Sequence, residues 1–234
     1  MVTKISFKSN LWLRHCIVAI PSLLFFALFW FTRMDWDPEM RFWRAIGDAS
    51  LLLLWLVLVI GPLSRVWLAA RALLSWRREI GIWCGVLGIA HSVLILNGWV
   101  RWDISVFFGY EFIPQLDRLA RVEPGFGLAN VLGMLAFFWL LVLTATSSDW
   151  AMNRLGSAAW KWLHNGAYIV FYLIVAHTFY FLFMHYTASF HRSVPTSSNW
   201  FQIPFVLLAL SVPILQVIGF LNTINARKQT KVRL

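Results

Sequence analysis

Three histidines lie inside long apolar stretches of the sequence, where ionisable side chains are rare and usually have a function. These are His91, His164 and His177. A neutral imidazole in such a place can bind a metal or transfer a proton. The remaining histidines lie at the ends of the apolar stretches or between them, and we expect them to be ordinary interfacial residues: His15, His185 and His191.

The helices that carry these histidines can be located from the charged residues. Asp, Glu, Lys and Arg leave six stretches that contain no charge, with lengths of 18, 16, 21, 25, 30 and 34 residues. Since a spanning helix needs about 20 apolar residues, each stretch is long enough for one span and too short for two. We therefore expect spans at about 12–32, 47–67, 80–100, 125–147, 161–186 and 201–224.

The composition supports the same interpretation. Of the 234 residues, 60% are hydrophobic and 13% are charged, whereas roughly 25% of a typical soluble domain is charged. Too few polar residues remain to cover a surface in water, which excludes a soluble enzyme. Cys16 and Cys84 both lie in apolar runs and indicate neither a disulfide nor a cysteine-based metal site. No internal repeat is apparent, and we expect a single all-α integral membrane domain over residues 1–234, a six-transmembrane-helix bundle.

The net charge of +10 is divided unequally between the two sides of this bundle. The side with both termini carries 13 Lys and Arg residues against two acidic residues, and the other side carries seven against eight. Because Lys and Arg are retained on the cytoplasmic face, both termini are expected to be cytoplasmic. The charge therefore indicates topology and membrane lipid, not nucleic acid. The outer connection 101–124 is expected to form short interfacial helices, either as a cover or as a docking surface.

Two of the three histidines lie at matching depth in the membrane. The third and fifth helices run in the same direction, so depth can be counted from their cytoplasmic cations. His91 follows Arg78 by 13 residues and His177 follows Lys161 by 16, which places them about 20 Å and 24 Å into the membrane. His164 lies three residues beyond Lys161, about 5 Å in. The sequence therefore predicts that His91 and His177 form a pair.

Two neutral imidazoles that face each other across a bundle suit haem iron, which takes one axial ligand from each side. Glycines beside the ligands leave room for the flat macrocycle, and the sequence offers Gly81, Gly85, Gly88 and Gly166. Zinc fits less well, because no carboxylate or cysteine lies at that depth to complete a tetrahedral site. Two alternatives to a haem site stay open. The glycines can serve close packing of the helices, and a histidine inside the membrane can simply form a hydrogen bond with a backbone carbonyl.

His164 needs a different explanation. In an ideal helix it lies about 140° away from His177, and the positions of matching depth on the third helix are Arg77 and Arg78. A second haem would therefore need an unusual ligand opposite His164. The alternative is a quinone or flavin site, where His164 handles protons and Arg77 or Arg78 supplies positive charge to the reduced cofactor.

Several short segments occur in a characteristic order along the chain. They are residues 61–65 (GPLSR), residues 77–84 (RREIGIWC) leading to His91, residues 143–147 (LTATS), residues 155–165 with Trp160 and His164, and finally His177. This order resembles the ferric reductase-like transmembrane domain superfamily, and within it the haem-binding membrane subunits of bacterial periplasmic methionine sulfoxide reductase systems. The resemblance implies that His91 and His177 ligate b-type haem, that His164 is a third haem or cofactor residue, and that Arg77 and Arg78 lie near a cytoplasmic flavin or quinone.

Together these features predict a b-type haem subunit, with one haem or two, that carries electrons across the bacterial inner membrane. The donor would be the quinone pool or a cytoplasmic flavin reductase with FMN, and the acceptor a periplasmic or other extracytoplasmic redox partner. No glycine-rich βαβ segment is present, so we expect an electron-transfer subunit and not a self-contained enzyme. The alternatives are a transmembrane ferric or cupric reductase and, from another class, a non-redox transporter or assembly factor with structural histidines.

Overall fold

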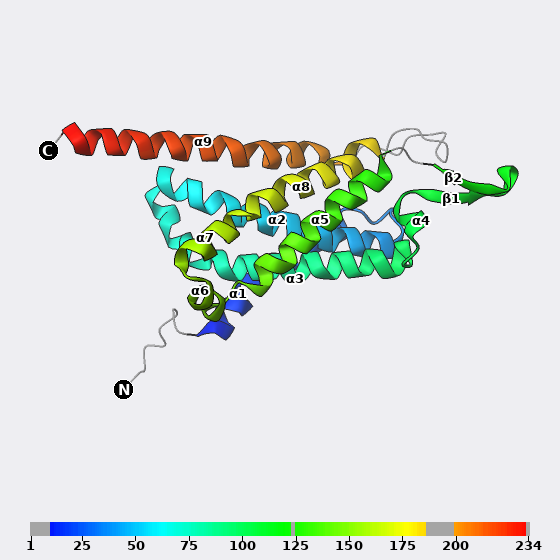
Figure 1. The fold of residues 1–234 in the computed structure, drawn as a ribbon, viewed down its shortest axis with the longest axis horizontal. Coiled ribbons are helices and arrows are strands. Elements are labelled where there is room, and N and C mark those ends of the chain that lie inside the picture. The colour runs from blue at the N-terminus through cyan, green and yellow to red at the C-terminus, as the bar shows by residue number, and fades with distance from the viewer. Residues whose placement is uncertain (1–9, 123–124, 186–198, 233–234) are drawn as a thin grey trace.

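The computed structural model describes residues 10–122, 125–185 and 199–232. These residues form an elongated helical bundle, in which α1 begins and α9 ends at the same end of the long axis (Figure 1). We call this the termini end of the bundle. The charged residues and histidines used in the sequence analysis that lie outside the described ranges are Lys4, Lys8, Glu123, His191, Arg192 and Arg233.

Six helices are long and apolar enough to cross a membrane, as predicted. The first, second and fourth spans are single helices: α1 (Leu11–Phe31), α2 (Pro38–Val66) and α5 (Phe126–Ala145). The third span consists of a 3₁₀ segment (Leu68–Trp76), α3 (Arg77–Leu94) and a π-helical segment (Ile95–Val100). The fifth consists of α7 (Ser157–Asn165), α8 (Ala167–Phe179) and a π-helical segment (Tyr180–Met184). The sixth is α9 (Gln202–Val232).

The second span differs most from its predicted range, because α2 begins at Pro38 and not near residue 47. Asp37 caps this helix: its carboxylate accepts hydrogen bonds from the backbone N–H groups of Glu39 and Met40, both at 3.0 Å. Proline is well suited to the first helical position, where its missing N–H would have had no partner. The helix therefore starts at its capping residues, which lie outside the charge-free run used for the prediction.

α2 is the central helix of the bundle. It packs against α1, α3, α8 and α9, and 61% of its most apolar window is buried, compared with 11% for α1 and 17% for α9. Leu53 and Leu58 lie in the middle of the core. Cys84 is buried there as a free thiol and Cys16 is exposed, so neither forms a disulfide, as predicted. α1 and α9 turn most of their apolar side chains outward, which is typical of helices in lipid.

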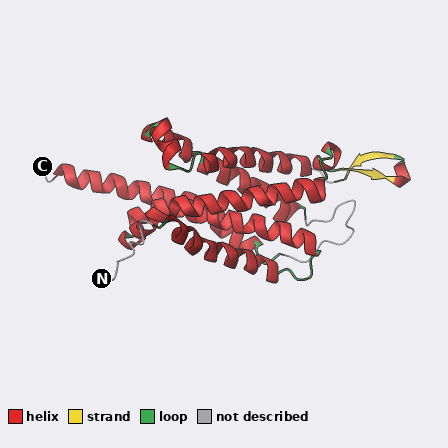
Figure 2. Cartoon of the chain, turned by 90° about the horizontal axis from the view of Figure 1, so that it is seen from below, coloured by secondary structure: helices red, strands yellow, loops and turns green. Residues whose placement is uncertain are grey.

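The connection between the third and fourth spans contains a β-hairpin, where the sequence predicts interfacial helices. In the described part of this connection, residues 101–122, α4 (Ile104–Phe107) is the only α-helix; β1 (Tyr110–Ile113) then pairs antiparallel with β2 (Arg118–Arg121). Between the strands, Pro114 cannot continue a helix, and Asp117 has a left-handed backbone with φ of 46°. These two residues make a turn, and the flanking residues pair across it. The hairpin projects from the bundle at the end opposite the termini end (Figures 1 and 2).

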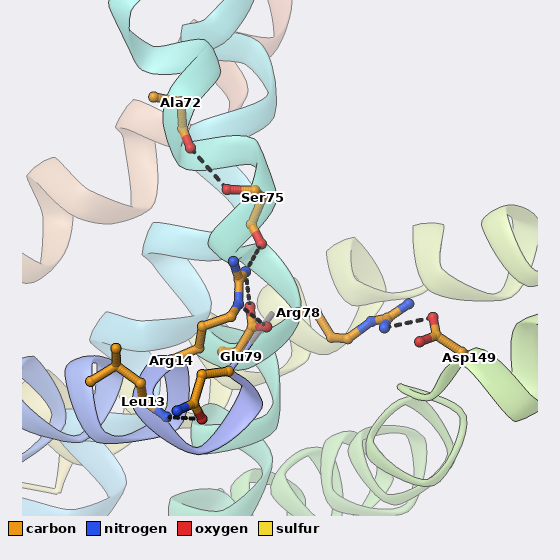
Figure 3. A network of polar contacts seen from close by, with 8 residues as sticks. Leu13, Arg14, Ala72, Ser75, Arg78, Glu79 and Asp149 are labelled. Carbon is orange, nitrogen blue, oxygen red and sulfur yellow. Dashed lines mark hydrogen bonds and ion pairs between the residues drawn. The ribbon is translucent and has the colours of Figure 1, made fainter. Parts of the chain in front are cut away.

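A buried ion pair fastens the first span to the third at the termini end. The guanidinium of Arg14 donates to both carboxylate oxygens of Glu79, at 2.7 and 2.8 Å, and also to the backbone oxygen of Ser75 (Figure 3). On the same helix, Arg78 pairs with Asp149 at the start of α6 (Asp149–Leu155), at 2.7 Å. The Glu79 side chain is 5% exposed, whereas that of Asp149 is 73% exposed.

We expect Glu79→Gln to destabilise the protein much more than Asp149→Asn. Breaking a buried pair leaves an uncompensated charge and costs roughly 3–5 kcal/mol, whereas an exposed pair contributes about 0–1 kcal/mol. Thermal unfolding of the purified variants in the same detergent should show a clearly lower midpoint for Glu79→Gln alone. Equal midpoints for the two variants would mean that the Arg14 pair does not hold the bundle together.

Candidate functional site

His91 lies on α3 and is fixed to α2 through its ring. Its Nδ1 lies 2.8 Å from the backbone oxygen of Trp43. Gly47, four residues further along α2, lies against the imidazole, and a Cβ there would meet Nδ1 at 2.8 Å. Because the carbonyl of a helical residue points toward the residue four positions ahead, the missing side chain at Gly47 lets the ring reach the Trp43 oxygen.

His177 on α8 is held by α5 in the same manner. Its Nδ1 lies 2.7 Å from the backbone oxygen of Ala129. Gly133, again four residues further along, lies against the ring, and a Cβ there would meet Nδ1 at 2.7 Å. Any larger residue at Gly133 would push the imidazole away from its acceptor.

The two histidine sites are copies of each other. In both, the histidine follows the residue whose carbonyl it contacts by 48 positions. In both, the helix changes to a π-helical segment shortly after the histidine, at Ile95 and at Tyr180. The helix pairs α2–α3 and α5–α8 (Figure 1) therefore form an internal structural repeat. The repeat was not predicted from the sequence, because few residues other than the glycines and histidines are shared between the two halves.

The backbone contacts determine the protonation of both rings. A carbonyl oxygen can only accept a hydrogen bond, so Nδ1 carries the proton in each neutral imidazole. Nε2 then presents a lone pair, which is the form in which histidine binds metals. Each ring is thus held in one orientation and one tautomer by the neighbouring helix.

His91 and His177 line the same cavity, which lies between α2, α3, α5 and α8 toward the hairpin end. The cavity is partly open to the outside. Small residues on three of these helices line it: Gly47, Gly88, Gly133 and Ala136. Because none of these four positions carries a large side chain, the helices leave room between them for a flat ligand.

The donor set favours a metal that brings its own additional ligands. Among the described residues, no group of three or more His, Cys, Asp and Glu side chains could hold a metal ion. Two imidazoles alone do not complete a tetrahedral zinc site. They do suit iron in a macrocycle, which takes its remaining ligands axially from protein side chains.

His185 differs from the sequence-based expectation of an ordinary interfacial residue. It lines the outer part of the cavity, and its ring lies 5.8 Å from that of Phe126 and 5.5 Å from that of Phe181. Counting residues along a helix gives the depth of His185 but not the side to which it turns. His15, in contrast, is partly exposed on α1, as expected.

His164 lies away from the cavity, near the termini end. Its Nε2 is 3.1 Å from the hydroxyl of Thr146, and its ring stacks on Trp160 with the centroids 3.9 Å apart. The indole of Trp160 also donates to the backbone oxygen of Thr146 at 2.8 Å. α7 ends at Asn165 and α8 begins at Ala167, so the angle calculated for one continuous helix does not describe how His164 and His177 are related.

Arg77 and Arg78 also lie at the termini end, and both already have partners. Arg77 donates through Nε to the backbone oxygen of Val57 at 3.0 Å, while Arg78 forms the exposed pair with Asp149 described above. The structure thus separates the predicted site residues into two groups: the pair that shares the cavity, and a second group formed by His164 and the two arginines.

The chain also matches a model of a known protein family. The model described as "Ferric reductase like transmembrane component" matches residues 46–175, more than half of the chain. The chain belongs to this family. The matched region contains Gly47, His91, Gly133 and His164 and ends two residues before His177. The resemblance seen in the sequence is therefore confirmed.

Relatives of this ferric reductase-like chain cover most of its length. The protein-methionine-sulfoxide reductase heme-binding subunit MsrQ of Salmonella arizonae is 28% identical over 216 residues, which are 88% of this chain and 94% of the relative. The subunits of the same name from Yersinia enterocolitica and Yersinia pseudotuberculosis are 29% and 32% identical over 178 residues, 74% of this chain and 82% and 73% of the relatives. With six apolar helices, the chain is a multi-pass protein of the bacterial inner membrane.

In this ferric reductase-like chain, most of the glycines predicted to lie beside the ligands lie elsewhere. Of the four it named, Gly88 lines the cavity, whereas Gly85 would place a Cβ against Thr144 and Gly166 against Trp139. The glycines that touch the histidine rings are Gly47 and Gly133, on neighbouring helices. One signal could have revealed them: a glycine precedes each of the paired histidines by the same 44 positions.

Proposed function

We propose that this ferric reductase-like protein binds b-type haem between His91 and His177 and carries electrons across the inner membrane. The observation that supports this most is the pair of neutral imidazoles, each fixed by a backbone carbonyl, on the walls of one cavity. The relatives are named as heme-binding subunits, which supports the same cofactor. When bound, the haem supplies a one-electron carrier.

The residues around the cavity would perform three tasks. His91 and His177 would hold the haem iron through Nε2. The carbonyls of Trp43 and Ala129 hold each ring in place and increase the basicity of its Nε2. The largely apolar walls keep water away, which limits the reorganisation that accompanies a change of charge at the iron.

The repeat supports one haem rather than two. The paired histidines are 86 positions apart, and the residue 86 positions before His164 is Arg78. A second haem held in the same way would need a ligand at that position, but Arg78 is a cation paired with Asp149. We therefore assign His164, Arg77 and Arg78 to a flavin or quinone that delivers electrons.

The donor would react at the termini end. The excess of Lys and Arg on the connections at that end supports a cytoplasmic orientation. A quinol or a reduced flavin there would meet His164 as a proton-handling group and the two arginines as positive charges. The haem cavity lies toward the opposite end, so electrons would leave on the periplasmic side.

The hairpin is the surface we assign to the electron acceptor. It projects from the bundle next to the cavity end (Figure 2), and its cross-strand pair Phe112 and Leu119 is apolar but 57% and 54% exposed. Exposed apolar residues surrounded by charged neighbours are typical of protein interfaces. The relatives are subunits of a protein-methionine-sulfoxide reductase, so we propose a periplasmic reductase of this kind as the partner.

His91→Ala and His177→Ala should each abolish the α band of dithionite-reduced haem while the protein still inserts into the membrane. Each variant removes one of the two imidazoles to which the proposed site assigns the iron. Absorption spectra of the purified variants, with a haem-to-protein ratio close to one for the wild type, provide the measurement. His15→Ala is the matched control and should keep the wild-type spectrum.

Two glycine variants test the same assignment without touching the ligands. Gly47→Ala and Gly133→Ala should lower haem content, because the new Cβ displaces the ring from its carbonyl, whereas Gly81→Ala meets nothing within 4 Å and should bind haem normally. A colourless wild-type protein, or full haem content in either histidine variant, would refute the proposed pair.

Replacing Arg77 and Arg78 together by Gln should slow reduction of the haem by reduced FMN or by menadiol several-fold. The variant loses the positive charge that we assign to the reduced cofactor, but the haem itself is unchanged, so dithionite should still reduce it fully. Stopped-flow absorbance follows both reactions. Asp149→Asn breaks the pair with Arg78 while keeping both cations, and it should react like the wild type. If reduced FMN and menadiol both reduce the haem of the double variant at the wild-type rate, the two arginines serve only the membrane topology.

Phe112→Ser combined with Leu119→Ser should slow reoxidation of the haem by a periplasmic methionine sulfoxide reductase. The double variant removes the exposed apolar pair from the hairpin without touching the cavity. Reoxidation by oxygen serves as the control and should keep its wild-type rate, because oxygen needs no docking surface. If the reductase reoxidises the variant at full speed, the hairpin is a structural cover and the partner binds elsewhere.

A further inference from the structure

Arg33 is a buried cation in which two of the three guanidinium nitrogen atoms have no hydrogen-bond partner among the described residues. It lies in the turn between α1 and α2 and is 2% exposed. Its Nη1 donates to the carboxylate of Asp48 at 2.6 Å. In the described part of the chain, its Nε and Nη2 are buried and have no acceptor. Such groups are costly to leave unpaired, so this edge of the guanidinium is suited to a ligand.

The guanidinium packs against aromatic rings beside the cavity. Its Cζ lies over the rings of Phe29 and Trp36, at 4.9 and 4.8 Å from their centroids. Arg33, Arg44 and Asp48 all line the same cavity as His91, and together they carry a net charge of +1. The cavity therefore combines a metal-binding pair of imidazoles with a positively charged outer part.

The unused edge has the geometry that recognises a carboxylate. Nε and Nη2 lie side by side on a guanidinium and donate in parallel to two oxygen atoms. The same edge of Arg14 does this elsewhere in the molecule, where it binds the two oxygens of Glu79 at 2.7 and 2.8 Å. A ligand carboxylate would take the corresponding place on Arg33.

We propose that Arg33 binds a propionate group of the haem through Nε and Nη2. This inference rests on the proposed function, and it adds which end of the cavity receives the acidic edge of the macrocycle. The propionates then lie at the outer part of the cavity beside Arg33, and the apolar edge of the macrocycle lies deeper in the bundle. Asp48 still accepts the hydrogen bond from Nη1 and keeps the guanidinium in its position.

Arg41 supplies a matched control. It is also buried at this end of the bundle, with 7% exposure and an Nε that lacks an acceptor among the described residues. It stacks on Trp30 at 4.0 Å and donates to the backbone oxygen of Met34 at 3.2 Å. It is not among the residues that line the cavity, so its replacement tests the loss of a buried arginine alone.

The test compares haem with haem dimethyl ester, in which both propionates are neutral esters. Haem-depleted protein in detergent is titrated with each compound, and binding is followed by the Soret absorbance. We expect the wild type and Arg41→Met to bind haem at least tenfold more tightly than the ester, because a charge-assisted bidentate contact is lost in the ester. Arg33→Met should lose this preference while its affinity for the ester stays near the wild-type value.

A second variant keeps the test valid if Arg33→Met folds poorly. Combining Arg33→Met with Asp48→Asn avoids leaving the Asp48 carboxylate buried without a partner, and it should show the same loss of preference. Equal affinity of the wild type for haem and ester, or an unchanged preference in the Arg33 variants, would overturn the propionate contact alone. Failure of the wild type to bind either compound would overturn the proposed function as well.

Discussion

An imidazole buried among apolar side chains needs an acceptor for its N–H, and in a helical membrane bundle the nearest acceptors are backbone carbonyls that already serve the helix. For a ring that approaches from a neighbouring helix, the second lone pair of such a carbonyl is easier to reach where the residue four positions ahead has no side chain. Gly47 and Gly133 provide this access for His91 and His177. The close approach of α2 to α3 and of α5 to α8, and the tautomer of both rings, follow from this one requirement.

The buried ion pairs lie at the two ends of the bundle. This arrangement allows electrons to cross the bundle but prevents ions from crossing it. Arg33 and Asp48 are paired at the hairpin end, and Arg14 and Glu79 at the termini end. Between them lies the core around the α2 leucines, including Leu53. Burying a charge there without a partner is costly, whereas an electron moving between cofactors needs no aqueous path. The apolar middle of the bundle therefore suits a protein that passes electrons and retains ions.

The sequence predicted the six spans and a matching depth for His91 and His177, because both depend on counting along helices of known rise; in the structure both histidines line one cavity. It did not predict the hairpin, where Pro114 and the left-handed Asp117 create a turn inside a segment of mixed polarity. It also missed Gly47, since contacts between helices depend on how each helix is rotated, which a single sequence does not specify. Arg33 was counted only as a topological charge, because its burial depends on the way α1 and α2 meet.

The internal repeat has a consequence for how the protein is made and maintained. Each half of the repeat supplies one histidine, so the proposed haem would bind to both halves and link them. A ligand that binds only the folded state adds about 2.7 kcal/mol of stability when its concentration is 100 times its dissociation constant. The lifetime of this subunit in the membrane would then follow the supply of haem, with empty chains removed first by membrane proteases. Cofactor availability would thus set the number of electron-transfer units without any change in gene expression.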